Sequence, residues 1–124
     1  MKILTLLLIA LLISPLVRAE EIEPPEPDSF TTVTGEEIRR LEVMHWKGQR
    51  LIAVGNFRQA VDLYWEIILL EPDDDSAYTN LGNLYLILGD IARAKDAFQN
   101  AVHINPHNED AAAGLFKIAN PDSP

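Results

Sequence analysis

The stretch Tyr78-Thr79-Asn80-Leu81-Gly82-Asn83-Leu84-Tyr85 decides the fold, because a looser copy of it lies earlier in the chain, around Gly48. When the sequence is compared with itself at this offset, similar residues coincide: Gly48 with Gly82, Gly55 with Gly89, Ala60 with Ala94, Tyr64 with Phe98, and Pro72 with Pro106. A repeat of about 34 residues that contains two helical stripes is typical of stacked helix pairs. The sequence therefore predicts an all-α fold.

Start and stop signals divide this fold into about five helices. Thr34 with Glu37, and Asn56 with Gln59, have the spacing of N-terminal caps, and prolines at 72, 106 and 121 end helical stretches. Asn108 is the expected cap of the last helix. We expect helices over about residues 34–55, 57–70, 75–88, 91–104 and 109–119.

The second copy contains Tyr78-x-x-Leu81-Gly82-x-x-Tyr85, followed by Ala94-x-x-x-Phe98, Ala101 and Pro106. This pattern resembles the tetratricopeptide repeat. The first copy resembles it more loosely, with Met44, Lys47, Gly48, Leu51, Ala60, Tyr64, Ile67 and Pro72 at the corresponding positions. Lys47 is the clearest departure, since the repeat has leucine there. The resemblance covers about residues 41–119 and implies a helix-turn-helix solenoid, in which Tyr85 and Phe98 pack beside the small residues Gly82 and Ala94.

The resemblance also divides the chain into regions. The helical domain is expected at 34–120, with repeats at about 41–74 and 75–108, a capping helix at 109–119, and a tail at 121–124. Two full repeats are fewer than the three usually needed for stability, which favours self-association.

The first nineteen residues have the pattern of a secretory signal peptide. An apolar run from Ile3 to Ile13 is shorter than the roughly 20 residues of a membrane-spanning helix, and Pro15 follows it. We expect cleavage after Ala19, export to a bacterial periplasm, and no membrane insertion of the mature chain. A retained anchor and a eukaryotic secreted protein are the alternatives.

An acidic, proline-rich segment follows the signal peptide. Residues 20–29 read EEIEPPEPDS and contain one apolar side chain, so residues 20–33 are expected to form a disordered spacer. The short apolar stretch Phe30-Thr31-Thr32-Val33 lies at its end.

In the family that the sequence resembles, the first helices of successive repeats line a concave groove that binds an extended peptide or a partner helix. Alignment of the repeats places Ser76 and Asp110 in this groove. It also gives the candidate partner-binding residues, which are Glu42, His45, Gln49, Ile52, Thr79, Asn80, Asn83, Leu86 and Lys117. Asn80 and Asn83 are the strongest candidates, because an amide can both donate to and accept from a peptide backbone.

The helix at 57–70 suggests a second surface. Leu63, Trp65 and Leu69 are apolar where the second repeat has Ala97, Gln99 and His103. An amphipathic helix with one buried face does not need these residues, so they are a candidate oligomer interface. The Phe30–Val33 segment and a different partner are the other candidates to cover them.

Composition and motifs restrict the function further. The formal charge is −9, with 10 basic and 19 acidic residues, which opposes binding to nucleic acid, and the chain has no cysteine. Asp73-Asp74-Asp75 is interpreted as helix capping, and His103 and His107 are separated by the helix-ending Pro106. No nucleophile, phosphate loop or zinc motif is recognisable, so we expect neither catalysis nor a cofactor. A hydrolase that uses carboxylates is the least favoured class.

These observations predict a non-catalytic adaptor that binds a protein or peptide in its groove, with a neutral or basic segment favoured by its own acidity. The alternative is a homo-oligomeric structural subunit of an envelope assembly that associates through the helix around Trp65.

Overall fold

The computed structural model describes residues 35–124. The expected signal peptide, the spacer and the cap at Thr34 lie outside the described residues. Five α-helices follow one another: α2 (Gly35–Ala53), α3 (Phe57–Leu70), α4 (Asp75–Ile87), α5 (Ile91–Ile104) and α6 (Glu109–Ala119). Residues 35–124 contain no strand, which confirms the all-α prediction.

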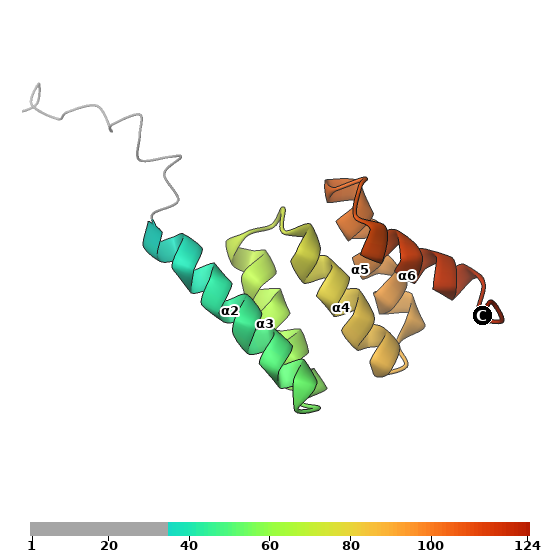
Figure 1. Ribbon diagram of the computed structural model, residues 1–124, viewed down its shortest axis with the longest axis horizontal. Helices are drawn as coiled ribbons and strands as arrows, with labels where there is room; N and C mark the ends of the chain where they lie inside the picture. The colour runs from blue at the N-terminus through green and yellow to red at the C-terminus, as the bar shows by residue number, and fades with distance from the viewer. Residues whose placement is uncertain (1–34) are drawn as a thin grey trace, which may run out of the picture. The chain divides into compact units, whose positions relative to one another are not determined.

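The helices form two layers. Each helix packs on the next in sequence, and α4 also contacts α6. In the view of Figure 1, α2, α4 and α6 lie in front, with α3 and α5 behind them. This is the helix-turn-helix solenoid expected from the repeat.

Glycine makes the turn inside each repeat. Gly55 has φ 82° and Gly89 has φ 81°, a left-handed conformation that glycine adopts without steric cost. The amides of Gly89 and Asp90 donate to the carbonyl oxygens of Leu86 and Tyr85, at 3.1 and 2.8 Å. These bonds close the C-terminus of α4 as a Schellman motif, and the turn after α2 is closed in the same way.

Side-chain caps start three helices, but not the one predicted at Asn56. The carboxylates of Asp74 and Asp90 accept from the amides of Ala77 and Arg93, and the Asn108 carbonyl accepts from Ala111, at 2.9 to 3.0 Å. Asn56 occupies the N-cap position of α3 without a side-chain cap bond. The expected cap at Asn56 is therefore wrong in its chemistry, although the helix begins where it was expected.

The core follows the spacing of small and large residues in the repeat. Ala60, Ala94 and Ala101 are fully buried where the helices cross, and Tyr64 and Phe98 fill the space beside them. Neither α2 nor any other helix in residues 35–124 is both long and apolar enough to cross a membrane.

Candidate functional site

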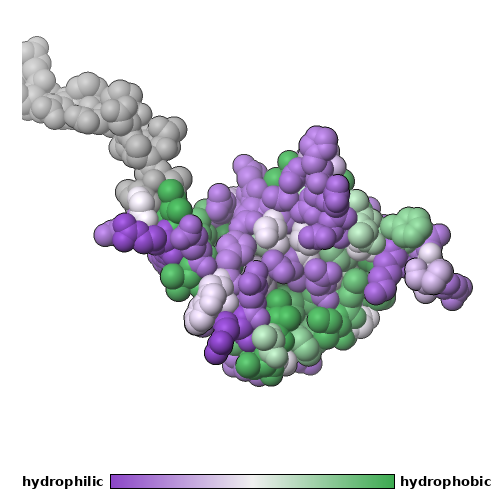
Figure 2. Space-filling view, in the orientation of Figure 1, coloured by the Kyte–Doolittle hydropathy of each residue, from purple (hydrophilic) through white to green (hydrophobic). Residues whose placement is uncertain are grey.

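A polar groove runs across the front helices. It encloses about 570 Å³ and is lined by one residue of α2, five of α4 and four from the α5–α6 turn and the start of α6: Gln49, Asp75, Ser76, Thr79, Asn80, Asn83, His107, Asn108, Glu109 and Asp110. Figure 2 shows that this face is largely hydrophilic over its middle and upper part, with hydrophobic residues gathered below. The groove can therefore offer hydrogen bonds and negative charge to a ligand.

The structure brings part of the predicted set together. Gln49, Thr79, Asn80 and Asn83 line the groove together. The remaining candidates are elsewhere: Glu42 and Lys117 are exposed outside its lining, and Ile52 and Leu86 are partly buried against the core. The side chains of Thr79 and Asn80 donate to the carbonyl oxygens of Asp75 and Ser76 in their own helix, at 2.8 and 3.0 Å.

The carboxylate of Asp75 joins two of the segments that line this groove. Asp75 Oδ2 accepts from the side-chain amides of Asn105 at 3.0 Å and Asn108 at 2.7 Å. The Asn108 amide also lies 2.9 Å from the hydroxyl of Thr79, which it reaches as a donor. These bonds tie the α5–α6 turn to the start of α4, so Asp75 has a positioning role that the capping interpretation of the three aspartates missed.

His45 makes the equivalent tie in the first repeat, instead of lining the groove. Its Nε2 lies 2.5 Å from Oδ2 of Asp74, and its ring lies edge-on to Tyr64 with 5.9 Å between ring centroids. His45 and Asp74 stand one repeat before Thr79 and Asn108, so the same pair of positions joins neighbouring front helices twice with different chemistry.

The Tyr64 hydroxyl is buried without a hydrogen-bond partner among the described residues. Burial, and to a lesser extent the negative charge of Asp74, raise the pKa of this hydroxyl above its ordinary value. Tyr64 therefore stays protonated and neutral over the physiological pH range.

The second predicted surface, on α3, is only partly present. Leu69 is 79% exposed and Trp65 is 44% exposed, but Leu63 is buried, at 7%. The expectation that Leu63 contributes to an exposed interface is therefore wrong, because this side chain is covered within its own chain. The Trp65 indole N–H donates to the Tyr85 hydroxyl at 3.0 Å, so Trp65 is held in one orientation.

The described residues contain no group of three or more His, Asp or Glu side chains placed to hold a metal. Stacked helix pairs with a polar groove on one face define a helical-repeat interaction module. Comparison with known proteins agrees, since the tetratricopeptide repeat family matches residues 76–108. Residues 76–108 therefore form a tetratricopeptide repeat, and domains built from this repeat are in general non-catalytic interaction modules.

One curated relative is a "Probable UDP-N-acetylglucosamine--peptide N-acetylglucosaminyltransferase SPINDLY" from Hordeum vulgare, which is 30% identical over 86 residues. The aligned part is 69% of this chain and 9% of the relative. The chain thus spans less than a tenth of that protein, and the similarity lies in its tetratricopeptide region.

Proposed function

We propose that this protein is an adaptor that binds an extended segment of a partner protein in the polar groove. The observation that carries the proposal is the cavity of about 570 Å³ whose lining comes from α2, α4 and α6. A ligand that contacts all three helices must extend across the array, which suits a peptide better than a compact small molecule.

The lining also favours a basic segment. Asp75, Glu109 and Asp110 contribute carboxylates, and the lining contains no lysine or arginine. Because the Asp75 carboxylate already accepts two amide hydrogen bonds, Glu109 and Asp110 are the groups we expect to meet a lysine or arginine of the partner. Asn83 lines the same groove and is suited to bind the peptide backbone.

The experiment is a binding assay with immobilised full-length protein and a library of extended peptides that differ in lysine and arginine content. Asn83→Ala should weaken all binding peptides. The double change Glu109→Gln with Asp110→Asn should weaken the basic peptides selectively, by about tenfold or more at low salt. Gln99→Ala on α5, and Asp122→Asn in the tail, are matched controls outside the groove. Equal binding by the groove variants and these controls would exclude the groove as the site.

Export to a bacterial periplasm is part of the proposal and rests on the sequence of residues 1–19 alone. Expression of the full chain in a bacterium, followed by fractionation and mass measurement, tests it. A mature chain that begins at Glu20 in the periplasmic fraction is expected, and an uncleaved chain in the membrane fraction would indicate an anchor.

Self-association through α3 is a second candidate function, because Leu69 and Trp65 remain exposed. Light scattering over a concentration series tests it. An oligomer that Trp65→Asp converts to a monomer would support a structural subunit, and a monomer at every concentration would exclude it.

A further inference from the structure

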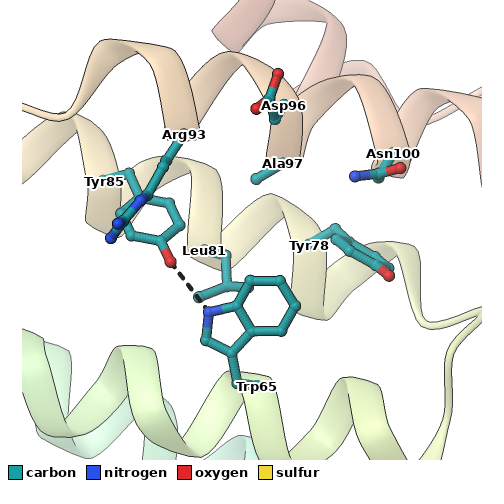
Figure 3. A pocket seen from close by; sticks show the side chains of 8 residues that line it. All are labelled: Trp65, Tyr78, Leu81, Tyr85, Arg93, Asp96, Ala97 and Asn100. Atoms are coloured by element: carbon teal, nitrogen blue, oxygen red, sulfur yellow. Dashed lines mark hydrogen bonds between the residues drawn. The ribbon is translucent and has the colours of Figure 1, made fainter.

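A second cavity lies between α3 and α5, outside the polar groove. It encloses about 350 Å³, with Leu81 of α4 among its lining residues. Figure 3 shows Trp65 rising from α3 toward α4, with Tyr85 and Tyr78 on either side of the opening and Ala97 on the facing helix α5. We call this cavity the interhelical pocket. Its volume is within the range of ligand sites.

One of the residues that line the pocket is smaller than its counterpart in the first repeat. Ala97 stands one repeat after Leu63, so the two residues occupy equivalent positions on α5 and α3. Leu63 is buried in the first repeat, and the smaller Ala97 stands at the equivalent position and lines the pocket. The repeat alone therefore does not require this cavity.

The walls of the pocket are already fixed in place. Trp65 donates from its indole nitrogen to the Tyr85 hydroxyl at 3.0 Å, and the Arg93 guanidinium lies over the Tyr85 ring at 5.7 Å from the ring centroid. Trp65 keeps 44% of its surface exposed despite this hydrogen bond. A ligand would thus meet aromatic surfaces that lose little freedom on binding.

The charges at the mouth select an uncharged ligand. Arg93 and Asp96 both line the pocket, so their opposite charges offset one another. Arg93 is also within 3.4 Å of the Asp90 carboxylate, which reduces its attraction for an anion. A cationic ligand would meet the same balanced pair, so charge gives it no advantage over an uncharged ligand.

We propose that the interhelical pocket is a second binding site, which takes an uncharged aromatic side chain of a partner polypeptide. The aromatic ring would pack against Trp65 and Tyr78 in the offset or edge-to-face arrangements that aromatic pairs prefer, with Leu81 and Ala97 as the apolar floor. Asp96 and Asn100 line the same pocket and can hydrogen-bond to the backbone that carries the ring. The site is independent of the groove, so the protein would hold two segments at once.

Nitrogen-15 NMR on the full chain tests the proposal, because the protein has only two tryptophans and Trp46 is an internal reference on α2. The probes are N-acetylphenylalaninamide, N-acetylleucinamide and N-acetyllysinamide. We expect the phenylalanine probe to shift the Trp65 indole signal and the Ala97 amide signal saturably at millimolar concentration, while the Trp46 indole signal stays in place. The leucine probe should bind more weakly, and the lysine probe should cause no saturable shift.

Ala97→Leu is the decisive variant, because it puts into the pocket the side chain that the first repeat has there. It should lower the affinity for the phenylalanine probe by roughly tenfold or more, because the added leucine side chain occupies the space of the aromatic ring. Ala92→Leu adds the same side chain at an exposed position of α5 and should leave the affinity unchanged. If Ala97→Leu does not fold, Trp65→Leu removes one wall instead, and the Ala97 amide signal reports the same loss.

Three results would overturn the proposal. Unchanged probe affinity in Ala97→Leu would exclude the pocket, and tighter binding of the leucine or lysine probe would exclude an aromatic ligand. A gain in probe affinity on Phe30→Ala would mean that the chain's own phenylalanine competes for the pocket, so no partner is needed to fill it.

Discussion

Phe98 is the residue on which two helix contacts depend. An added Cβ at Gly82 would lie 2.5 Å from Cε1 of the Phe98 ring, and one at Gly114 would lie 2.5 Å from its Cζ. The ring is fully buried, so it has no solvent-filled space into which it can move. The glycines thus allow α4 and α6 to approach the same ring on α5.

We expect Gly82→Ala to lower the free energy of unfolding by about 1–3 kcal/mol through overpacking, less the gain of up to about 1 kcal/mol from helix propensity. Urea unfolding followed by circular dichroism measures this change. Gly35→Ala is the matched control, because a Cβ there meets nothing within 4 Å. An equal shift of the two midpoints would contradict the close contact.

Tyr64 occupies in the first repeat the position that Phe98 occupies in the second, and its extra hydroxyl is buried without a partner among the described residues. A buried polar group without a hydrogen bond costs about 1–3 kcal/mol. Tyr64→Phe should therefore leave the free energy of unfolding unchanged or raise it. The reverse change, Phe98→Tyr, should lower it by a similar amount, since it buries a hydroxyl on the ring carbon Cζ, which lies against both Gly114 and Gly82. A clear loss of stability in Tyr64→Phe would indicate that an ordered water bonds this hydroxyl.

The raised pKa of the Tyr64 hydroxyl also predicts a pH dependence. Below about pH 10, tyrosine is protonated in both the folded and the unfolded chain, so this residue gives no pH dependence. Above that pH the unfolded chain releases the proton while the folded chain retains it, and stability falls as pH rises. Urea midpoints measured from pH 8 to 11 should fall more steeply for the natural chain than for Tyr64→Phe. Identical slopes would contradict the assigned shift.

At the scale of the helices, the boundaries could be predicted because distinct residues mark them. Pro72, Pro106 and Pro121 stand outside the helices, and Gly55 and Gly89 take up the left-handed conformation after α2 and α4. The cap chemistry at Asn56 could not be predicted, because a side-chain bond depends on backbone geometry as well as on residue type. Asn56 has φ −83° and ψ 60°, whereas the bonded cap Asn108 has ψ 92°.

A cap with a side-chain hydrogen bond, Asp90, and a cap without one, Asn56, give a matched pair of variants. Asp90→Ala should lower the free energy of unfolding by about 1 kcal/mol, because the amide of Arg93 loses its acceptor. Asn56→Ala should lower the free energy of unfolding by only a few tenths of this amount, because no side-chain hydrogen bond is lost. Thermal unfolding of both variants under one buffer condition measures the difference, and equal losses would show that Asn56 forms its cap in solution.

The groove was partly predictable for the same reason as the helices. The repeat period places Gln49 and Asn83 on the same face of equivalent helices, and both line the cavity. It does not show that Asp75 bonds to Asn108, nor that Trp65 and Ala97 come together in one pocket. Those contacts join residues from different helices, whose distances depend on packing and not on sequence spacing.

At the scale of the array, α6 closes one end and α2 stands at the other. Four large apolar side chains are exposed on α2 or just after it: Ile38, Val43, Trp46 and Val54. No helix among residues 35–124 precedes α2 to cover them. At the other end, α6 buries Ala111 completely and places Gly114 against Phe98. Stability in such arrays is close to a sum over repeats and their interfaces, so the closing helix should contribute a large share.

Truncation of the chain after His107 tests how much α6 contributes to the free energy of unfolding. It removes α6 and with it the contacts of Ala111, Leu115 and Ile118 with the core, and it uncovers part of Phe98. A large apolar side chain contributes about 1.5–3 kcal/mol when it is fully buried. Leu115 and Ile118 are partly buried and Phe98 loses part of its cover, so the loss should be about 3 kcal/mol, a large part of the total stability of a small domain. The truncated chain should therefore be largely unfolded by circular dichroism at room temperature. Removal of residues 121–124 alone should change little, because they are exposed. A truncated chain that stays helical and cooperative would mean that the first four helices are sufficient, and that α6 serves the groove through Glu109 and Asp110 more than it serves the fold.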